Sequence, residues 1–247
     1  MRSSNPTLQS NAFANFGYLT DRSEMMTVQG VITKTLICLF CVLLTASYTW
    51  YQFYTTGDVN AVSGWMTVGL IGGLVLALVT IFKKEWAMYS APAYALFEGL
   101  FLGGISAMFE MQFHGIVIQA VGLTFGTMFC MLFIYQSGLI QVTDKFRIGV
   151  FAATGAVALV YIVSLVLSFF GIQVPFIYSN GLIGIGFSLL VVGIAALNLV
   201  LDFDFIERAA AQGAPKYMEW YASFGLMVTL IWLYLEFLRL LSKIRSR

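Results

Sequence analysis

Residues 178–201 read YSNGLIGIGFSLLVVGIAALNLVL and contain no charged side chain. A helix of roughly 20 apolar residues is long enough to cross the hydrocarbon core of a bilayer, so this run predicts a membrane-spanning helix. A membrane strand is excluded, because the run is continuously apolar rather than alternating and an open strand edge in lipid leaves backbone groups unpaired. The run decides the fold class, because stretches of the same kind recur along almost the whole chain.

Seven stretches are long and apolar enough, or nearly so, to span a membrane. They are residues 30–52, 64–82, 89–109, 115–136, 148–170, 178–201 and 217–241. We therefore expect an all-α, polytopic membrane protein with a single seven-helix transmembrane domain over 30–247. Residues 1–29 are polar and lack the apolar core of a signal peptide, and we expect them to form a flexible N-terminal tail.

Composition points the same way. Hydrophobic residues make up 60% of the 247 residues and charged residues 10%, with a mean hydropathy of +0.86. A soluble domain is about a quarter charged, so lipid must cover much of this surface and the bilayer is the main expected partner. A net charge of +1 provides no basic face for phosphates, which argues against nucleic acid as a partner.

Lysine and arginine gather in alternate loops, which predicts the orientation of the chain. They flank the first span or follow the second, fourth and sixth spans: Arg22, Lys34, Lys83, Lys84, Lys145, Arg147, Arg208 and Lys216. By the positive-inside rule the N-terminus is cytoplasmic. The C-terminal residues Arg239, Lys243, Arg245 and Arg247 break this pattern if the seventh segment crosses fully, or else that segment enters and returns. We favour a full crossing.

Carboxylates inside the spans are the best candidates for function, because a charge is costly in lipid and is usually retained for a purpose. Glu98 lies midway along the third span, with no lysine or arginine in the central part of a neighbouring span. It is expected to be protonated, hydrogen-bonded or associated with a cation. The alternative is a structural, protonated glutamate bonded to another helix.

Asp202 and Asp204 close the sixth span, and Glu236 lies late in the seventh. Residues two apart face different directions on a helix, so at most one aspartate points squarely into the bundle. Asp204 precedes Arg208 by four residues, which suits an ordinary ion pair. Glu236 precedes Arg239 by three and has the same local alternative.

Other features of the sequence are weaker. Gly99 and Gly103, like Gly122 and Gly126, lie four apart, a spacing that allows close helix packing. His114 is the single histidine, so a metal site with transition-metal ligand spacing or a serine triad is not expected. No Gly-x-Gly-Asp segment supports an aspartyl protease. We therefore predict a protein that is not an enzyme and holds no cofactor.

The sequence resembles the Bax inhibitor-1 family, specifically its bacterial branch, over nearly everything after residue 30. The resemblance is carried by the segments APAY and EGLFLGGIS at 91–94 and 98–106, LDFDFI at 201–206, and WLYLEFL at 232–238. It implies seven helices with the C-terminal helix central, in the inner membrane of a bacterium.

The resemblance also implies a pH-sensitive calcium leak in which acids of the last two helices meet. Carried over, Asp202 and Glu236 are the proton-sensing gate and a Ca²⁺ site, with Glu236 replacing the usual aspartate. Glu98, in the EG motif, and Asp204 are assigned to the cation pathway. Protonation would rearrange the contact between the gate residues and change access to the pore, and Ca²⁺ would be the transported ion.

The sequence departs from the family pattern at two places. An arginine that engages the acidic pair is expected about three turns after the EG motif, and residues 107–111 (AMFEM) contain none. An insertion around 209–218 also lengthens the separation between the two acids. If the seventh span starts near Tyr217, Glu236 lies about 28 Å along it, which would leave Asp202 near the inner face and Glu236 near the outer.

Two functions of different classes follow. The first is a cation leak gated by carboxylate protonation, which hard oxygen ligands suit for Ca²⁺. The second is a non-transporting regulator that binds a membrane protease or another membrane protein complex, with the polar N-terminal tail as the contact.

Overall fold

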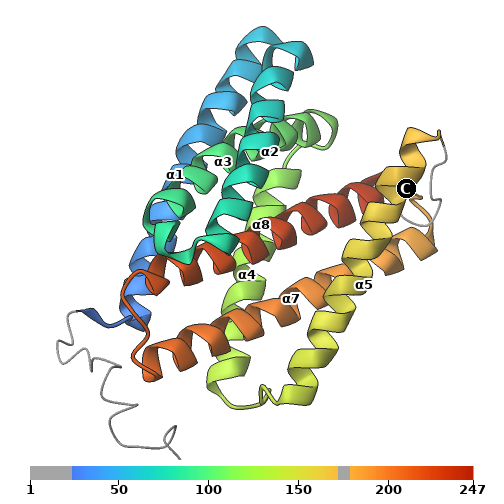
Figure 1. Ribbon diagram of the computed structural model, residues 1–247. Helices are drawn as coiled ribbons and strands as arrows, with labels where there is room; N and C mark the ends of the chain where they lie inside the picture. The colour runs from blue at the N-terminus through green and yellow to red at the C-terminus, as the bar shows by residue number, and fades with distance from the viewer. Residues whose placement is uncertain (1–23, 172–178, 247) are drawn as a thin grey trace, which may run out of the picture.

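The computed structural model describes residues 24–171 and 179–246 (Figure 1). These residues form seven long α-helices, one 3₁₀ turn and no strand beyond an isolated antiparallel bridge. The elements are α1 (Val28–Thr56), α2 (Val59–Phe82), η4 (Lys84–Trp86), α3 (Ala87–Gln112), α4 (Ile116–Gln136), α5 (Asp144–Phe169), α7 (Leu182–Ala211) and α8 (Met218–Arg245). Each of the seven long helices is long and apolar enough to cross a membrane, which confirms the predicted fold class. Residues 1–23 of the predicted tail lie outside the described residues.

Polar side chains fix where several helices begin. The side chains of Thr27, Asp58 and Thr143 accept a backbone N–H in the first turns of α1, α2 and α5. Glu110, at the end of α3, accepts the backbone N–H groups of Gly115 and Val117. The first turn of a helix has N–H groups without intrahelical partners, so these side chains satisfy donors that would otherwise be left in or near lipid.

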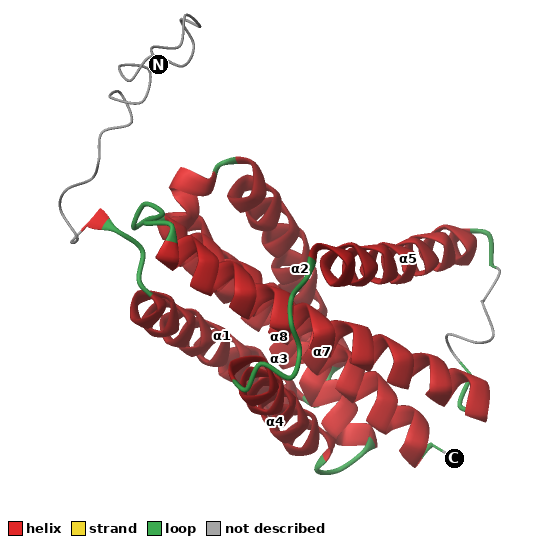
Figure 2. Ribbon diagram, turned by 90° about the horizontal axis from the view of Figure 1, so that it is seen from below, coloured by secondary structure: helices red, strands yellow, loops and turns green. Residues whose placement is uncertain are grey.

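Helix α8 is the central element, as predicted. It packs against α1, α3, α4 and α7, and Figures 1 and 2 show it running through the middle of the bundle beside the antiparallel α7. Of its most apolar 18 residues 61% are buried, against 17% for α2, α4 and α5. Helix α5 lies at the edge in both views and packs mainly on α7.

The connections gather at two opposite ends of the bundle. At one end, Met26 N donates to Ala214 O in the α7–α8 loop, and Lys84 lies over the ring of Tyr221 early in α8. At the other end, Arg245 near the C-terminus donates to the backbone oxygen of His114 in the α3–α4 loop. Because α8 is uninterrupted between these ends, it crosses the bundle fully and does not turn back.

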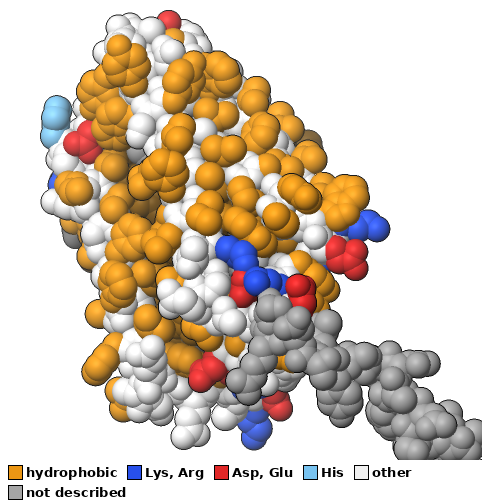
Figure 3. Space-filling view, turned by 90° about the vertical axis from the view of Figure 1, so that its left-hand side faces the viewer, with side chains coloured by type: hydrophobic (Ala, Val, Ile, Leu, Met, Phe, Trp, Pro, Cys, Tyr) orange, Lys and Arg blue, Asp and Glu red, His pale blue; other side chains and the backbone are white. Residues whose placement is uncertain are grey.

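The lateral surface is apolar. Figure 3 shows one face covered by hydrophobic side chains, with most charged side chains toward its margins. Large side chains such as Phe40, Leu43 and Leu74 are more than half exposed. An apolar surface of this extent cannot face water in a soluble protein, so the bilayer covers it.

The two glycine pairs differ in their packing. A Cβ atom added at Gly99 or Gly103 would collide with the α1 backbone, 3.0 Å from Val42 Cα in the first case and 2.6 Å from Ala46 Cα in the second. A Cβ atom added at Gly122 would meet nothing within 4 Å, and the same is true of Gly126. The spacing therefore creates close packing on α3 and none on α4.

Candidate functional site

Five acidic side chains are buried or half-buried in the described bundle, apart from Glu110, which caps α4. They are Glu98 on α3, Asp202 and Asp204 on α7, and Glu219 and Glu236 on α8. Because a buried carboxylate is tolerated when it is paired, hydrogen-bonded or protonated, the partners of each acid indicate which of them has capacity for a proton or a cation.

Asp204 is fully occupied by two arginines. Its side-chain oxygens accept from Arg147 Nη2 of α5 at 2.9 Å and from Arg208 Nε, one turn later on α7, at 2.8 Å. Arg208 also donates to Val142 O in the α4–α5 loop. The ion pair with Arg208 is the local pair that the four-residue spacing predicts. The bond to Arg147 is a second contact that the sequence does not predict. This triad ties α5 to the end of α7.

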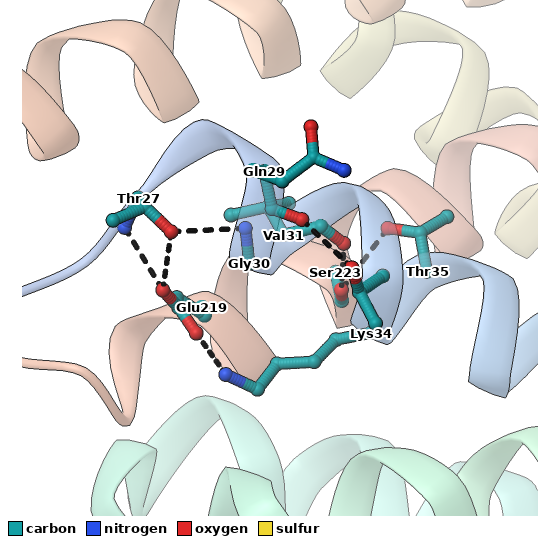
Figure 4. A network of polar contacts seen from close by, with 9 residues as sticks. Thr27, Gln29, Gly30, Val31, Lys34, Thr35, Glu219 and Ser223 are labelled. Atoms are coloured by element: carbon teal, nitrogen blue, oxygen red, sulfur yellow. Dashed lines mark hydrogen bonds and ion pairs between the residues drawn. The ribbon is translucent and has the colours of Figure 1, made fainter.

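Glu219, which hydropathy and spacing do not single out, forms the best-connected acidic site (Figure 4). One of its oxygens accepts the backbone N–H and hydroxyl of Thr27 at 2.9 and 3.0 Å, and the other pairs with Lys34 of α1. Ser223, one turn later, donates to Val31 O and hydrogen-bonds Thr35. The signal in the sequence was an acid in the first turn of α8, where the helix dipole favours it.

The N-terminal segment continues this connection. Met26 N donates to Ala214 O, and Lys216 N donates to Glu24 O across an antiparallel bridge between Met25 and Pro215. Residues 24–27, the last part of the predicted tail before α1, are thus bound to the α7–α8 loop.

Glu236 is 1% exposed and pairs within α8. Its Oε1 accepts from Arg239 Nη1 at 2.7 Å and from the hydroxyl of Tyr161, on α5, at 2.9 Å. The Arg239 guanidinium also lies 4.9 Å from the Tyr161 ring centroid, a cation–π distance. The second oxygen, Oε2, is buried and has no hydrogen-bond partner among the described residues. Arg239 of α8 thus engages Glu236, whereas residues 107–111 of α3 contain no arginine.

The remaining basic residues of the C-terminal segment also have partners within the bundle. Lys243 is buried and donates to Gly184 O at 3.0 Å and Ser188 Oγ at 2.9 Å in α7. Arg245 donates to His114 O and to Gln119 Oε1 of α4. The C-terminal end of α8 therefore carries more positive than negative charge around Glu236.

Asp202 lies within α7 and not at its end, although the sequence predicts that the sixth span ends at residue 201. The physical reason is that α7 continues to Ala211, nine residues or about 14 Å beyond Asp202. Its side chain is within hydrogen-bonding reach of Thr229 on α8. Its Oδ2 is buried without a hydrogen-bond partner among the described residues.

The predicted contact between Asp202 and Glu236 is absent from the described hydrogen bonds and ion pairs. Thr229, which marks the depth of Asp202, precedes Glu236 by seven residues, or about 10 Å along α8. Asn198, one turn before Asp202 on α7, donates to Thr154 of α5 at 2.8 Å. The two acids belong to one side of the bundle and occupy different depths.

Glu98 belongs to α3 and lies beside a different face of α8 from Asp202. It lines a cavity of about 370 Å³ between α2, α3 and α8, together with Gly225 and Val228 of α8. Tyr94, one turn earlier on α3, is within hydrogen-bonding reach of it. Val228 of α8 faces this cavity, and the next residue, Thr229, faces Asp202. Glu98 and Asp202 therefore lie at similar depth on two sides of α8.

The five acids thus fall into two groups among the described residues. Asp204, Glu219 and Glu236 each form an ion pair with a basic residue. Glu98 and Asp202, at middle depth, form none. No group of three His, Cys, Asp or Glu side chains that could hold a metal ion occurs in the described part of the chain.

Comparison with known proteins gave one match. A family model described as Bax inhibitor 1 like matches residues 5–246, nearly the whole chain. Neither the search of curated proteins nor the search of solved structures returned a match.

Proposed function

The chain belongs to the Bax inhibitor 1-like family, and from this membership and the acids around α8 we propose that it is a proton-gated cation leak. The observation that carries the proposal is Asp202, a mid-membrane carboxylate beside the central helix with a buried oxygen that no described residue satisfies. An unsatisfied carboxylate oxygen in this position favours a proton or a cation.

Ca²⁺ is the ion we favour, because hard oxygen ligands suit it. The structure supports a closed state at the outer end: Arg239 and Tyr161 hold Glu236, and the positive charges of Arg239 and Lys243 oppose the passage of a cation. Protonation of Glu236 removes the charge that binds Arg239. The guanidinium is then released, α8 and α5 lose a link, and cation flux through the Asp202 level rises.

Glu236 thus acts as the proton-sensing gate and Asp202 as the cation site within the path. They act at different depths rather than as one pair. Asp204, which both arginines neutralise, then contributes to the anchoring of α5 and α7, and the earlier assignment of Glu98 to the cation pathway stays a prediction.

Ca²⁺ flux into proteoliposomes across a pH series tests the proposal. Asp202→Asn is expected to lower flux at every pH, because it removes the charge at the cation site. Glu236→Gln is expected to raise flux at neutral pH and to flatten its rise at low pH, because the neutral amide weakens the bond to Arg239 as protonation does. Glu85→Gln, in the exposed turn between α2 and α3, is the matched control. Absence of flux in the wild type, or flux that ignores both substitutions, would sink the proposal.

Orientation and location are part of the same proposal. The end of the bundle that carries Lys83, Lys84, Arg147 and Arg208 faces the cytoplasm together with the N-terminus, by the positive-inside rule. We infer the inner membrane of a bacterium from the resemblance of the sequence. Cysteine-labelling of the α1–α2 and α2–α3 loops in intact cells tests it, since only the first should be labelled by an impermeant reagent.

The rival function is a regulator that binds another membrane protein. Residues 24–27 are bound to the α7–α8 loop, so a partner that engages the N-terminal segment would act directly at the start of α8. Co-purification of a membrane protein that is lost on deletion of residues 1–23, together with no ion flux, would favour this reading over the leak.

A further inference from the structure

The cavity that contains Glu98 combines one carboxylate with apolar and aromatic walls. Its volume is about 370 Å³, within the range of small-molecule sites. The apolar lining comes mostly from Leu70, Leu74 and Ala77 of α2 and Val228 of α8. The polar atoms come from Glu98 and from the hydroxyl of Tyr94. A site of this kind selects a ligand with one charge and an apolar body.

Aromatic rings lie beside the acid. Tyr94 and Phe224 of α8 both line the cavity, and their ring centroids are 5.0 Å apart at an interplanar angle of 78°. The faces of such rings attract organic cations. Glu98 forms no ion pair with any basic residue that the structure describes, so its negative charge is available to a ligand.

The cavity opens toward lipid. Leu70 and Leu74 on its wall are 51% and 60% exposed, on a helix that packs chiefly on α3. Glu98 lies eleven residues after the start of α3, about 16 Å along it, near the middle of a hydrocarbon core of about 30 Å. A ligand therefore reaches the carboxylate from within the bilayer.

A divalent metal ion is a poor fit for this cavity. Ca²⁺ takes six to eight oxygen ligands, and the cavity lining offers the two oxygens of Glu98 and one hydroxyl, with no other acid or amide side chain. An organic cation needs only one counter-charge and gains from the apolar walls.

We propose that the cavity between α2, α3 and α8 is a binding site for a lipophilic organic cation, in which Glu98 pairs with the charge and Tyr94 and Phe224 contact the cationic group. The site is separate from the outer gate at Glu236, and the inference does not rest on the proposed leak because it concerns binding alone. A lipophilic cation partitions into the bilayer, so its concentration beside Glu98 is higher than in water.

Binding of tetraphenylphosphonium, a permanently charged lipophilic cation, tests the proposal. The full-length protein in nanodiscs is titrated with the probe while a selective electrode reads its unbound concentration, and protein-free nanodiscs are subtracted. Saturable binding at one site per protein is expected. Glu98→Gln should weaken it at least tenfold, and the neutral triphenylphosphine oxide should not compete.

A second variant separates loss of the site from loss of the fold. Gly225 lines the cavity, and a Cβ atom added there meets nothing within 4 Å. Gly225→Leu should fill the cavity and abolish binding while Glu98 remains. Gly122→Leu, at a position on α4 with the same open space, should bind as the wild type does. The proposal is overturned if the wild type shows no saturable binding, if Glu98→Gln binds equally well, or if Gly225→Leu binds like Gly122→Leu.

Discussion

Replacing Gly103 of α3 by alanine adds one methyl group at the contact between α3 and α1. The new Cβ atom would lie 2.6 Å from Ala46 Cα, whereas carbon atoms in favourable contact are about 3.5–4.0 Å apart. The two backbones must therefore separate by about 1 Å. Thr49, whose hydroxyl also lies against Gly103, is fully buried and cannot move aside.

Overpacking of this kind costs about 1–3 kcal/mol. Gly122→Ala is the matched control: the residue is also a helical glycine in a four-residue glycine pair, and its Cβ atom meets open space. Alanine is favoured over glycine within a helix by up to about 1 kcal/mol. Both variants gain this helix propensity, so it cancels in the comparison, and Gly103→Ala should lie about 1–3 kcal/mol below Gly122→Ala in free energy of unfolding.

Unfolding by a titration of SDS in mixed micelles, followed by tryptophan fluorescence, measures the difference. The control also reports any general effect of alanine on helix formation in detergent. Equal stability of the two variants, within about 0.5 kcal/mol, would refute the reasoning, because it would mean that α1 and α3 do not approach closely at Gly103.

Two further predictions concern the ion pairs of α8. Arg239→Gln should lower the free energy of unfolding by about 1.5–3 kcal/mol, the range for a hydrogen bond to a charged group. The loss should be smaller when Glu236→Gln is already present, and strict additivity of the two changes would contradict their coupling. Lys34→Met leaves the carboxylate of Glu219 buried beside Thr27 without its cation and should cost about 3–5 kcal/mol. Adding Glu219→Gln should recover most of that loss in the same SDS titration, and an equally unstable double variant would show that the ion pair is not the cause.

The spans were predictable because lipid imposes length and apolarity on every helix that crosses it. The errors concern helix ends. The sixth span was expected to end at residue 201, and α7 ends at Ala211. Asp202 and Asp204 looked like the first polar residues of a loop, yet Thr229 and Arg147 provide partners that keep both within the helix. Hydropathy records the cost of burying a carboxylate and contains no information on a distant partner.

In the candidate site, too, local contacts are predictable from the sequence and contacts between distant residues are not. Contacts three or four residues apart follow from helix periodicity, so Glu236 with Arg239 and Asp204 with Arg208 were visible in the sequence. The bond from Tyr161 to Glu236 spans 75 residues and depends on how α5 packs. The glycine pairs make the point again, because identical spacing gives close packing on α3 and open space on α4.

The basic C-terminal segment, which seemed to contradict the predicted topology, is explained by its contacts. Arg239 neutralises Glu236, Lys243 donates to the backbone and a serine at the start of α7, and Arg245 donates to the α3–α4 loop and to Gln119. Because these positive charges are bonded within the bundle, they stabilise the C-terminal end of α8 and need not mark a cytoplasmic side. At this end of α8, Glu236 is the acid whose protonation would free a basic residue, Arg239, whereas Glu98 and Asp202 form no ion pair among the described residues. Under the proposed leak, a proton at Glu236 and a cation at Asp202 therefore act about 10 Å apart along α8, without the direct carboxylate pair that the family resemblance implies.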